Sequence, residues 1–203
     1  MLYNTHMSDQ ALPVEFYDRN TLDVARSLLG MRLIRKFDSI RLVGIITETE
    51  AYRGEEDLAC HARAGLTPRT RVMFGRAGHA YVYFTYGMHW LLNVVTEREG
   101  FPAAVLIRAV RVVEGEAWIR ERRKGVPPKN WTDGPAKLCR AFEIDGKLNG
   151  ADLTVTENGL WIARGQDIPE EYIERTARIG IDSVPEPWRS IPWRFRARDE
   201  FMV

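Results

Sequence analysis

The chain has 203 residues, of which 45% are hydrophobic and 28% are charged, and its net charge is +1. This composition is typical of one globular domain with a well-buried core. Its two cysteines, Cys60 and Cys139, lie far apart, which excludes a disulfide framework and a four-cysteine zinc or iron–sulfur cluster. The apolar runs are strand-sized and the N-terminus is mixed and polar, so we expect no membrane span and no signal peptide. We therefore expect an intracellular protein, located in the cytoplasm or nucleoid if the source is prokaryotic.

The first third of the chain predicts a helix and then a pair of strands. We expect residues 1–13 to be a flexible N-terminus and residues 14–203 to form one domain, because no internal segment has the composition of a linker. The stretch NTLDVARSLLG predicts an amphipathic helix that is capped by Asn20 and stops at Gly30. The runs MRLIRKF and IRLVGIITETEAY flank Asp38-Ser39 and predict a hairpin.

Further strands are predicted in the middle of the chain, by HAYVYFTYGMHWLLNVVT and AAVLIRAV. Three helices are expected after them: EGEAWIRERRKG ending at Gly125, GPAKLCRAFEI opening with Pro135, and PEEYIERTARIG ending at Gly180. IPWRFRA predicts a last strand. Because the strands cluster centrally, we predict an α+β fold, with a mainly antiparallel curved sheet, flanking helices and a protruding hairpin.

The charge is unevenly distributed along the chain. Residues 58–96 contain no Asp or Glu, although the average frequency of acids would place about five there, and they include Arg63, Arg69, Arg71, Arg76 and three of the four histidines. A local basic field suits a polyanion such as DNA. A buried hairpin beside a few solvated arginines would explain the composition equally well.

The segment ETEAYRGEEDLACH, residues 48–61, concentrates side chains that can do chemistry. In an extended strand the two-residue period places Glu48, Glu50 and Tyr52 on one face, and Thr47 and Thr49 on the other. A carboxylate and an aromatic ring would then project together near the end of the strand. Taken alone, this segment favours the simpler interpretation, in which both glutamates are exposed on an edge strand.

A second segment, AYVYFTYGMHW, predicts an aromatic hairpin. Tyr81 and Tyr83 share a strand face, and their residue type alone favours a place in the core. Tyr86 and Gly87 lie where the chain must reverse. A tyrosine at an exposed tip within a basic stretch is suited to stack on a base or to wedge into a duplex.

These segments together resemble the alkyladenine DNA glycosylase family, also called 3-methyladenine or methylpurine DNA glycosylases. The resemblance is carried by GIITETEAYRGEEDLACHARAGLTPRTRVMFGRAGHAYVYFTYGMHWLLNVV, AVLIRA and GPAKLCRAF, and it extends over residues 21–195. It implies a monofunctional enzyme of base excision repair that flips a damaged purine out of duplex DNA and hydrolyses its glycosidic bond. The substrates it implies are alkylated or deaminated purines of the 3-methyladenine, 7-methylguanine and hypoxanthine class.

The resemblance also assigns roles to individual residues. Glu50 matches the general base that activates water, and Arg108 matches the arginine that helps to hold this water and the carboxylate. Three residues match the sandwich around the flipped base, namely Tyr52, His61 and Tyr83. Asn93 matches the residue that disfavours the 2-amino group of guanine. Tyr86 matches the residue that fills the gap in the duplex, with its neighbour Met88, and the phosphate-contact candidates are Arg69 and Lys137.

The chemistry of the residues agrees with these roles. Cleavage of an N-glycosidic bond builds positive charge on the sugar, so a single carboxylate can both activate water and stabilise that charge. We expect no metal, no cofactor, no membrane and no obligatory protein partner, and a monomer whose partner is double-stranded DNA containing damaged purines. A Cys60-His61 metal pair is not expected, because adjacent residues seldom reach one ion.

Two other functions are compatible with the same residues. One is a catalytically inert nucleic-acid-binding module on the same scaffold, in which Glu50 is only structural. The other is a nucleosidase that acts on free nucleosides, which would not need the basic stretch. Release of a free base from duplex DNA separates both of them from a glycosylase.

Overall fold

The strand β2 (Ile40–Arg53) lies at the centre of the sheet and organises the fold. The computed structural model describes residues 8–201. One edge of β2 pairs with β5 (Ala103–Glu114). Its other edge pairs first with β1 (Arg32–Phe37) and then, further along, with β8 (Arg194–Ala197). Residues in the second half of β2 are therefore surrounded by backbone on both sides.

Within the described residues, the sheet has eight strands, and every strand pairing recorded between them is antiparallel. The strand order is β3-β4-β5-β2-β1-β6, with β8 joined to β2 and β7 joined to β8. The remaining strands are β3 (Ala80–Thr85), β4 (His89–Val95), β6 (Leu160–Ala163) and β7 (Ile173–Thr176). This open antiparallel sheet with separate helices is the single-domain α+β fold predicted from the sequence.

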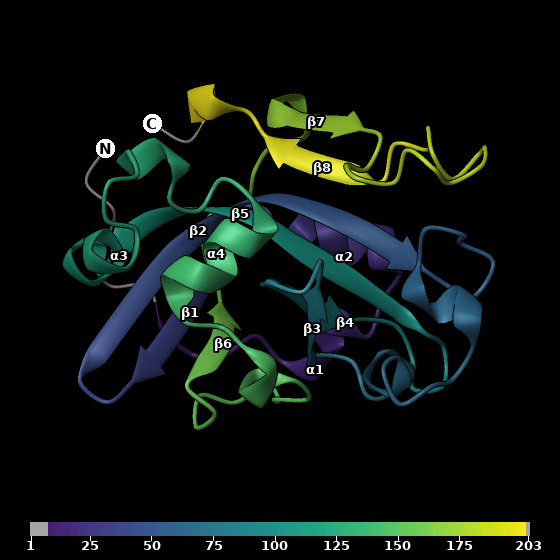
Figure 1. Ribbon diagram of the computed structural model, residues 1–203, viewed down its shortest axis with the longest axis horizontal. Coiled ribbons are helices and arrows are strands. Elements are labelled where there is room, and N and C mark those ends of the chain that lie inside the picture. Colours follow the sequence, from purple (N-terminus) through teal and green to yellow (C-terminus); the bar gives the residue numbers. More distant parts are fainter. Residues whose placement is uncertain (1–7, 202–203) are drawn as a thin grey trace.

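The helices cover both faces of the sheet. They are α1 (Val14–Tyr17), α2 (Thr21–Ser27), α3 (Glu116–Arg122) and α4 (Pro135–Phe142). Figure 1 shows α4 in front of the long strands and α2 behind them. In α4 the side chains of Leu138, Ala141 and Phe142 recur at helical spacing and are buried in the main hydrophobic core. Among residues 8–201, no helix has the length and apolar character needed to cross a membrane.

Several local predictions are confirmed at the level of single contacts. The side chain of Asn20 accepts a hydrogen bond from the backbone N–H of Leu22, so it caps α2 as expected. Phe37 pairs with Ile40 across the predicted two-residue turn. Asp38 in this turn has φ of 49°, a conformation that Asp tolerates better than most residues.

The prediction of a helix from Pro169 to Gly180 is wrong. Residues Glu170–Tyr172 form one 3₁₀ turn, and the chain then continues as β7, which pairs with β8. Ile173 is buried in this strand, so tertiary pairing overrides the helical composition of the segment. The short strand β6 was not predicted, and α3 ends at Arg122, before the expected stop at Gly125.

The beginning of the described chain packs against the sheet. Ala11 forms a β-bridge with Ala163, and Leu12 is buried. Asp9 forms ion pairs with Arg32 and Arg41. The expectation of a flexible segment over residues 1–13 stays a prediction, and residues 1–7 lie outside the described part.

Close packing at Gly44 of β2 gives the first testable prediction. A Cβ atom at this position would lie 2.5 Å from Cγ2 of Val110 and 3.0 Å from the ring of Phe142. Because backbone and core must shift to admit it, we expect Gly44→Ala to lower the free energy of unfolding by about 1–3 kcal/mol in chemical denaturation. Gly134→Ala is the control, since the nearest atom to its Cβ lies 3.9 Å away. Equal losses in the two variants would contradict this account.

Candidate active site

A cavity of about 300 Å³ opens between the β3–β4 hairpin, the C-terminal end of β2, the first half of β5, and the loop at residues 179–181. Six of the predicted site residues line it: Tyr52, His61, Tyr83, Tyr86, Asn93 and Arg108. They come from segments far apart in the chain. The structure therefore brings most of the predicted site together in one place.

Glu50 lies directly behind the wall of this cavity and is fully buried. Its Oε2 accepts a hydrogen bond from the Tyr52 hydroxyl at 2.8 Å. Its Oε1 accepts one from the backbone N–H of Ile179 at 2.7 Å and lies 3.2 Å from Nη1 of Arg108. Burial raises the pKa of Glu50 above its usual value, against the opposing effects of Arg108, the amide of Ile179 and the Tyr52 hydroxyl.

The interpretation of Glu48 and Glu50 as exposed residues of an edge strand is wrong. Both are buried, because β2 pairs with β5 on one side and with β8 on the other. The predicted facing is confirmed for the three polar side chains: Arg108 contacts both glutamates, whereas the hydroxyl of Thr49 donates to the carbonyl of Ala25 on α2.

A pair of β-bulges explains how one arginine reaches two carboxylates. The ladder between β2 and β5 runs from Ile46–Val110 to Glu48–Ala109 and then to Thr49–Ile107, so Thr47 and Arg108 are each left without a partner. A bulge re-aims the side chain of the extra residue. Arg108 therefore turns toward β2 and lines the cavity.

The aromatic side chains of the cavity are arranged as two walls. The rings of His61 and Tyr83 meet edge to face, with centroids 4.5 Å apart and an interplanar angle of 76°. A flat base that stacks between two parallel rings needs the rings to be about 7 Å apart, which is twice the ordinary contact distance. The space between His61 and Tyr83 is too small for this. His61 and Tyr83 therefore form one wall, and Tyr52 lines the cavity separately.

His61 is neutral at physiological pH. Burial, together with Arg69 and Arg63, lowers its pKa to about 4. Its Nδ1 lies 3.0 Å from the hydroxyl of Tyr81, and Arg69 approaches its Nε2. Arg69 also lies over the ring of Tyr83, so this predicted phosphate contact lies beside the aromatic wall.

Arg178 supports the opposite wall and was not identified from the sequence. Its guanidinium lies 4.7 Å from the centre of the Tyr52 ring and 5.2 Å from that of Trp193. It forms a fully buried, bidentate ion pair with Asp57 and donates to the carbonyl of Ala51. A buried arginine held this firmly fixes the ring of Tyr52.

Ile179 and Gly180 complete the cavity and were also missed. The sequence assigned them to the end of a helix, but they follow β7 in a loop. The amide of Ile179 contacts Glu50, and its side chain is half exposed at the cavity. The sequence could not predict this contact of Ile179, because it is made by the backbone and does not depend on the type of side chain.

The other predicted site residues differ in whether they line the cavity. Asn93 is buried in the cavity wall, where its amide donates to the carbonyl of Tyr81. Met88 is exposed in the hairpin turn. Lys137 pairs with Asp133 on the exposed side of α4 and does not line the cavity. The four arginines of the basic stretch are exposed, as a polyanion-binding surface requires: Arg63, Arg69, Arg71 and Arg76.

Tyr86 stands at the tip of the β3–β4 hairpin, where the sequence placed it. Thr85 pairs with His89, and the amide of Met88 donates to the carbonyl of Thr85 to close the turn. Tyr86 and Gly87 have positive φ values of 51° and 67°. The Tyr86 side chain is 81% exposed although it also lines the cavity, so it projects from the rim.

Comparison with known proteins identifies the family of the chain. Residues 15–201 match the profile of the methylpurine-DNA glycosylase family. A protein of Methanocella arvoryzae is 49% identical over 91% of this chain and 90% of its own length. One of Carboxydothermus hydrogenoformans is 48% identical over 95% of this chain and 97% of its own. Both bear the provisional name 3-methyladenine DNA glycosylase.

The fold and site thus define an enzyme that hydrolyses N-glycosyl bonds in DNA. The chain belongs to the methylpurine-DNA glycosylase family. Its substrate is DNA, and its process is DNA repair. In the described chain, no group of three or more His, Cys, Asp or Glu residues is placed to hold a metal ion.

The exposed tyrosine generates a prediction about base flipping. If Tyr86 fills the space of the flipped nucleotide, its ring replaces lost stacking, which contributes roughly 1–3 kcal/mol. We expect Tyr86→Ser to slow excision from duplex DNA by about 5- to 150-fold, measured under single-turnover conditions.

The control for Tyr86→Ser is excision from a single-stranded oligonucleotide. The same change should matter less there, because no duplex stack is broken. Fluorescence of a base analogue opposite the lesion reports the flipping step directly. If flipping and excision both stay at wild-type rates while the circular dichroism is unchanged, Tyr86 is not the wedge.

Proposed function

We propose that this protein is a monofunctional DNA glycosylase that flips alkylated or deaminated purines into the aromatic cavity and excises them by water attack on the N-glycosidic bond. The observation that carries the proposal is the placement of Glu50. It is a buried carboxylate behind the cavity wall, bonded to two residues of that wall, Tyr52 and Arg108.

Glu50 is the proposed general base. Its oxygens offer about four lone-pair positions, and three donors already occupy positions on them, so about one remains for a water molecule. A carboxylate whose pKa is raised by burial is a better proton acceptor than an exposed one. The ionised group also stabilises positive charge that develops on the sugar as the bond to the base breaks.

The flipped base is proposed to stack between Tyr52 on one side and the His61–Tyr83 pair on the other. Electron-rich rings favour a cationic base by roughly 0.5–2 kcal/mol each. Here Arg178 already lies over one ring and Arg69 over the other. Because each ring has a cation on one face, its attraction for a second, cationic base is weakened. The stacking site then gives cationic purines a smaller advantage, which supports a substrate range that includes neutral purines such as hypoxanthine.

Asn93 is proposed to restrict the site against normal guanine. Its buried side chain is fixed in the wall by a hydrogen bond to the carbonyl of Tyr81. A purine that carries a 2-amino group would have to displace or desolvate this amide, at a cost of about 1–3 kcal/mol for a polar group left without a partner.

An inert DNA-binding module and a nucleosidase are the competing functions. Incubation with a duplex that carries a single hypoxanthine, followed by alkaline cleavage, separates the three. A glycosylase leaves an abasic site that alkali cleaves, and an inert module binds without release. A nucleosidase releases base from mononucleosides instead.

The role of Glu50 is tested by an isosteric change. We expect Glu50→Gln to abolish excision while lesion binding stays within a few-fold, because an amide keeps the shape but cannot accept the proton of water. Glu56→Gln, a change of an exposed carboxylate in the following loop, is the matched control and should be fully active. Unchanged turnover in Glu50→Gln would remove Glu50 from the mechanism.

The dependence of the excision rate on pH tests both the activation of water by Glu50 and the protonation of the leaving purine. Glu50 must be ionised to act as the general base. Activity is therefore lost as the pH falls through the pKa of Glu50, which burial raises. An N-alkylated purine leaves with its positive charge already in place, whereas hypoxanthine must be protonated to leave. We therefore expect a bell-shaped profile for hypoxanthine, and an acid limb alone for 3-methyladenine. The same profile for both lesions would argue against this division.

A further inference from the structure

Glu48 is a second buried carboxylate beside Glu50, and none of the roles described so far includes it. Its side chain is 12% exposed. One of its oxygens, Oε1, accepts hydrogen bonds at 2.6 Å from Nε of Arg108 and from Nε of Arg194. Two arginines from different strands therefore converge on a single oxygen atom.

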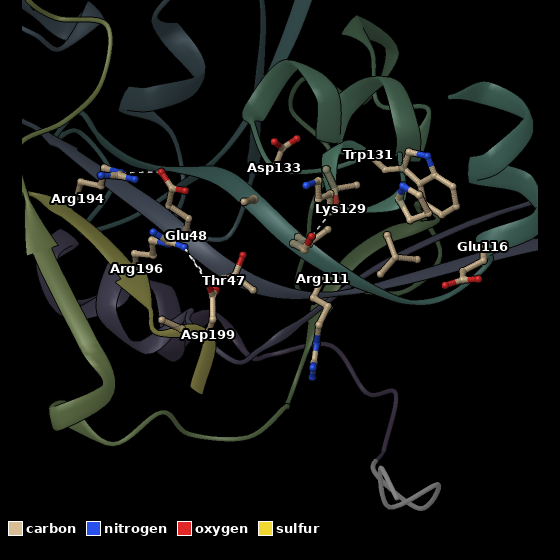
Figure 2. A pocket seen from close by; sticks show the side chains of 16 residues that line it. Thr47, Glu48, Arg111, Glu116, Lys129, Trp131, Asp133, Arg194, Arg196 and Asp199 are labelled. Atoms are coloured by element: carbon tan, nitrogen blue, oxygen red, sulfur yellow. Dashed lines mark hydrogen bonds and ion pairs between the residues drawn. The ribbon is translucent and has the colours of Figure 1, made fainter. Parts of the chain in front are cut away.

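Glu48 connects the aromatic cavity, through its bond to Arg108, with a second cavity that it lines itself. Arg108 lines the aromatic cavity, whereas Glu48 and Arg194 line a larger one of about 590 Å³ on the other side. Figure 2 shows Glu48 beside Thr47 and bonded to Arg194 in this larger cavity. Access from that cavity, together with two guanidinium partners, favours the ionised form of the Glu48 carboxylate.

The two carboxylates are in opposite electrostatic situations. Burial alone would raise the pKa of Glu48, but the hydrogen bonds and charges of Arg194 and Arg108 outweigh it and lower that pKa. For Glu50 burial prevails, and the negative charge of Glu48 is one of the groups that raise its pKa. The strong hydrogen bond of Arg108 goes to Glu48 through Nε, and only Nη1 approaches Glu50, at 3.2 Å.

We propose that Glu48 is a positioning residue for catalysis: it holds Arg108 by its Nε, offers Glu50 only one end of the guanidinium, and thereby keeps Glu50 basic. The inference rests on the proposed role of Glu50 as general base. Without Glu48, Arg108 turns fully to Glu50 and forms a closer ion pair with it. Glu50 then ionises more easily and accepts a proton less readily.

The direction of the change follows from the groups around Glu50. These are Arg108 from β5, Tyr52 and Glu48 from β2, the amide of Ile179, and Tyr83 from β3. Glu48 is the other carboxylate of the set, and both arginines that it binds stay after its removal. The local charge becomes more positive, so the pKa of Glu50 falls.

The experiment measures the single-turnover rate of excision from a hypoxanthine duplex as a function of pH. We expect Glu48→Gln to move the acid limb of the profile down by about one pH unit, the low end of the effect of a neighbouring charge. The rate on the plateau should fall by about 5- to 10-fold, because a weaker base accepts the proton less readily. Lesion binding should stay within a few-fold.

Arg194→Gln separates a charge effect from loosening of the structure. This variant removes a cation from the same cluster, so the acid limb should stay in place or move up. Loosening alone would slow both variants without moving the acid limb of Glu48→Gln to lower pH. Arg196→Gln is the matched control, because Arg196 lines the same cavity and pairs with Asp199. Its profile should be that of the wild type.

The outcomes distinguish this inference from the proposed function. If the wild-type protein releases neither hypoxanthine nor an alkylated purine from a duplex, the proposed function itself is wrong. If it releases base and Glu48→Gln is folded by circular dichroism but keeps the wild-type acid limb, Glu48 does not position Arg108. If Glu48→Gln does not fold, Glu48→Asp gives the test, since a shorter carboxylate keeps the charge and should retain the wild-type acid limb at a reduced rate.

Discussion

The burial of Glu50 is the constraint on which the rest of the site depends. An ionised carboxylate removed from water is costly unless donors replace the lost hydration. The fold supplies three of them from different parts of the chain: the hydroxyl of Tyr52, the guanidinium of Arg108 and the amide of Ile179. The carboxylate is thus stabilised without being neutralised, and its pKa still lies above the usual value.

This requirement explains features of the fold that are otherwise irregular. The bulges between β2 and β5 interrupt a regular ladder, but they turn Arg108 toward both glutamates. The small strands β7 and β8 lead into and out of the loop that carries Ile179, and β8 pairs with β2 directly at Glu48 and Glu50. The C-terminal part of the chain therefore adds two strands to the sheet and contributes the loop that lines the site.

The sequence predicted most of the elements, and it identified candidate side chains whose own chemistry suits the proposed site. The N-cap of α2, the hairpin turns and most of the strands follow from local patterns, whereas the helix ends expected at Gly30, Gly125 and Gly180 do not. Glu50, Tyr52 and Tyr86 are conspicuous because of their residue types and spacing. Contacts made by the backbone could not be predicted in this way. Ile179 acts through an amide that every residue except proline has, and its neighbours have a helical composition that pairing with β8 overrides.

The burial of Glu48 could not be read from its segment for a related reason. Alternation along β2 placed it correctly beside Glu50, but whether that face meets water depends on strands joined from residues 103–114 and 194–197. Two adjacent carboxylates on a strand look like a solvated edge until the partners are known. Only the register of the sheet turns them into one charge cluster with Arg108.

The residues proposed for DNA recognition and the residue proposed for catalysis differ in how much they contribute to stability. The residues of the hairpin tip, Tyr86 and Met88, are exposed and bury little surface, so their identity contributes little to folding. Glu50 and Arg178 are buried. Loss of Arg178 would leave the buried carboxylate of Asp57 without its ion-pair partner, and loss of the Glu50 charge would remove one of the two carboxylates that contact Arg108. Changes at the tip can therefore be made at almost constant stability, whereas the end that contains Glu50 is tied to the stability of the central strands. For this reason a variant of the end that contains Glu50 is informative only when its folding is measured with its activity.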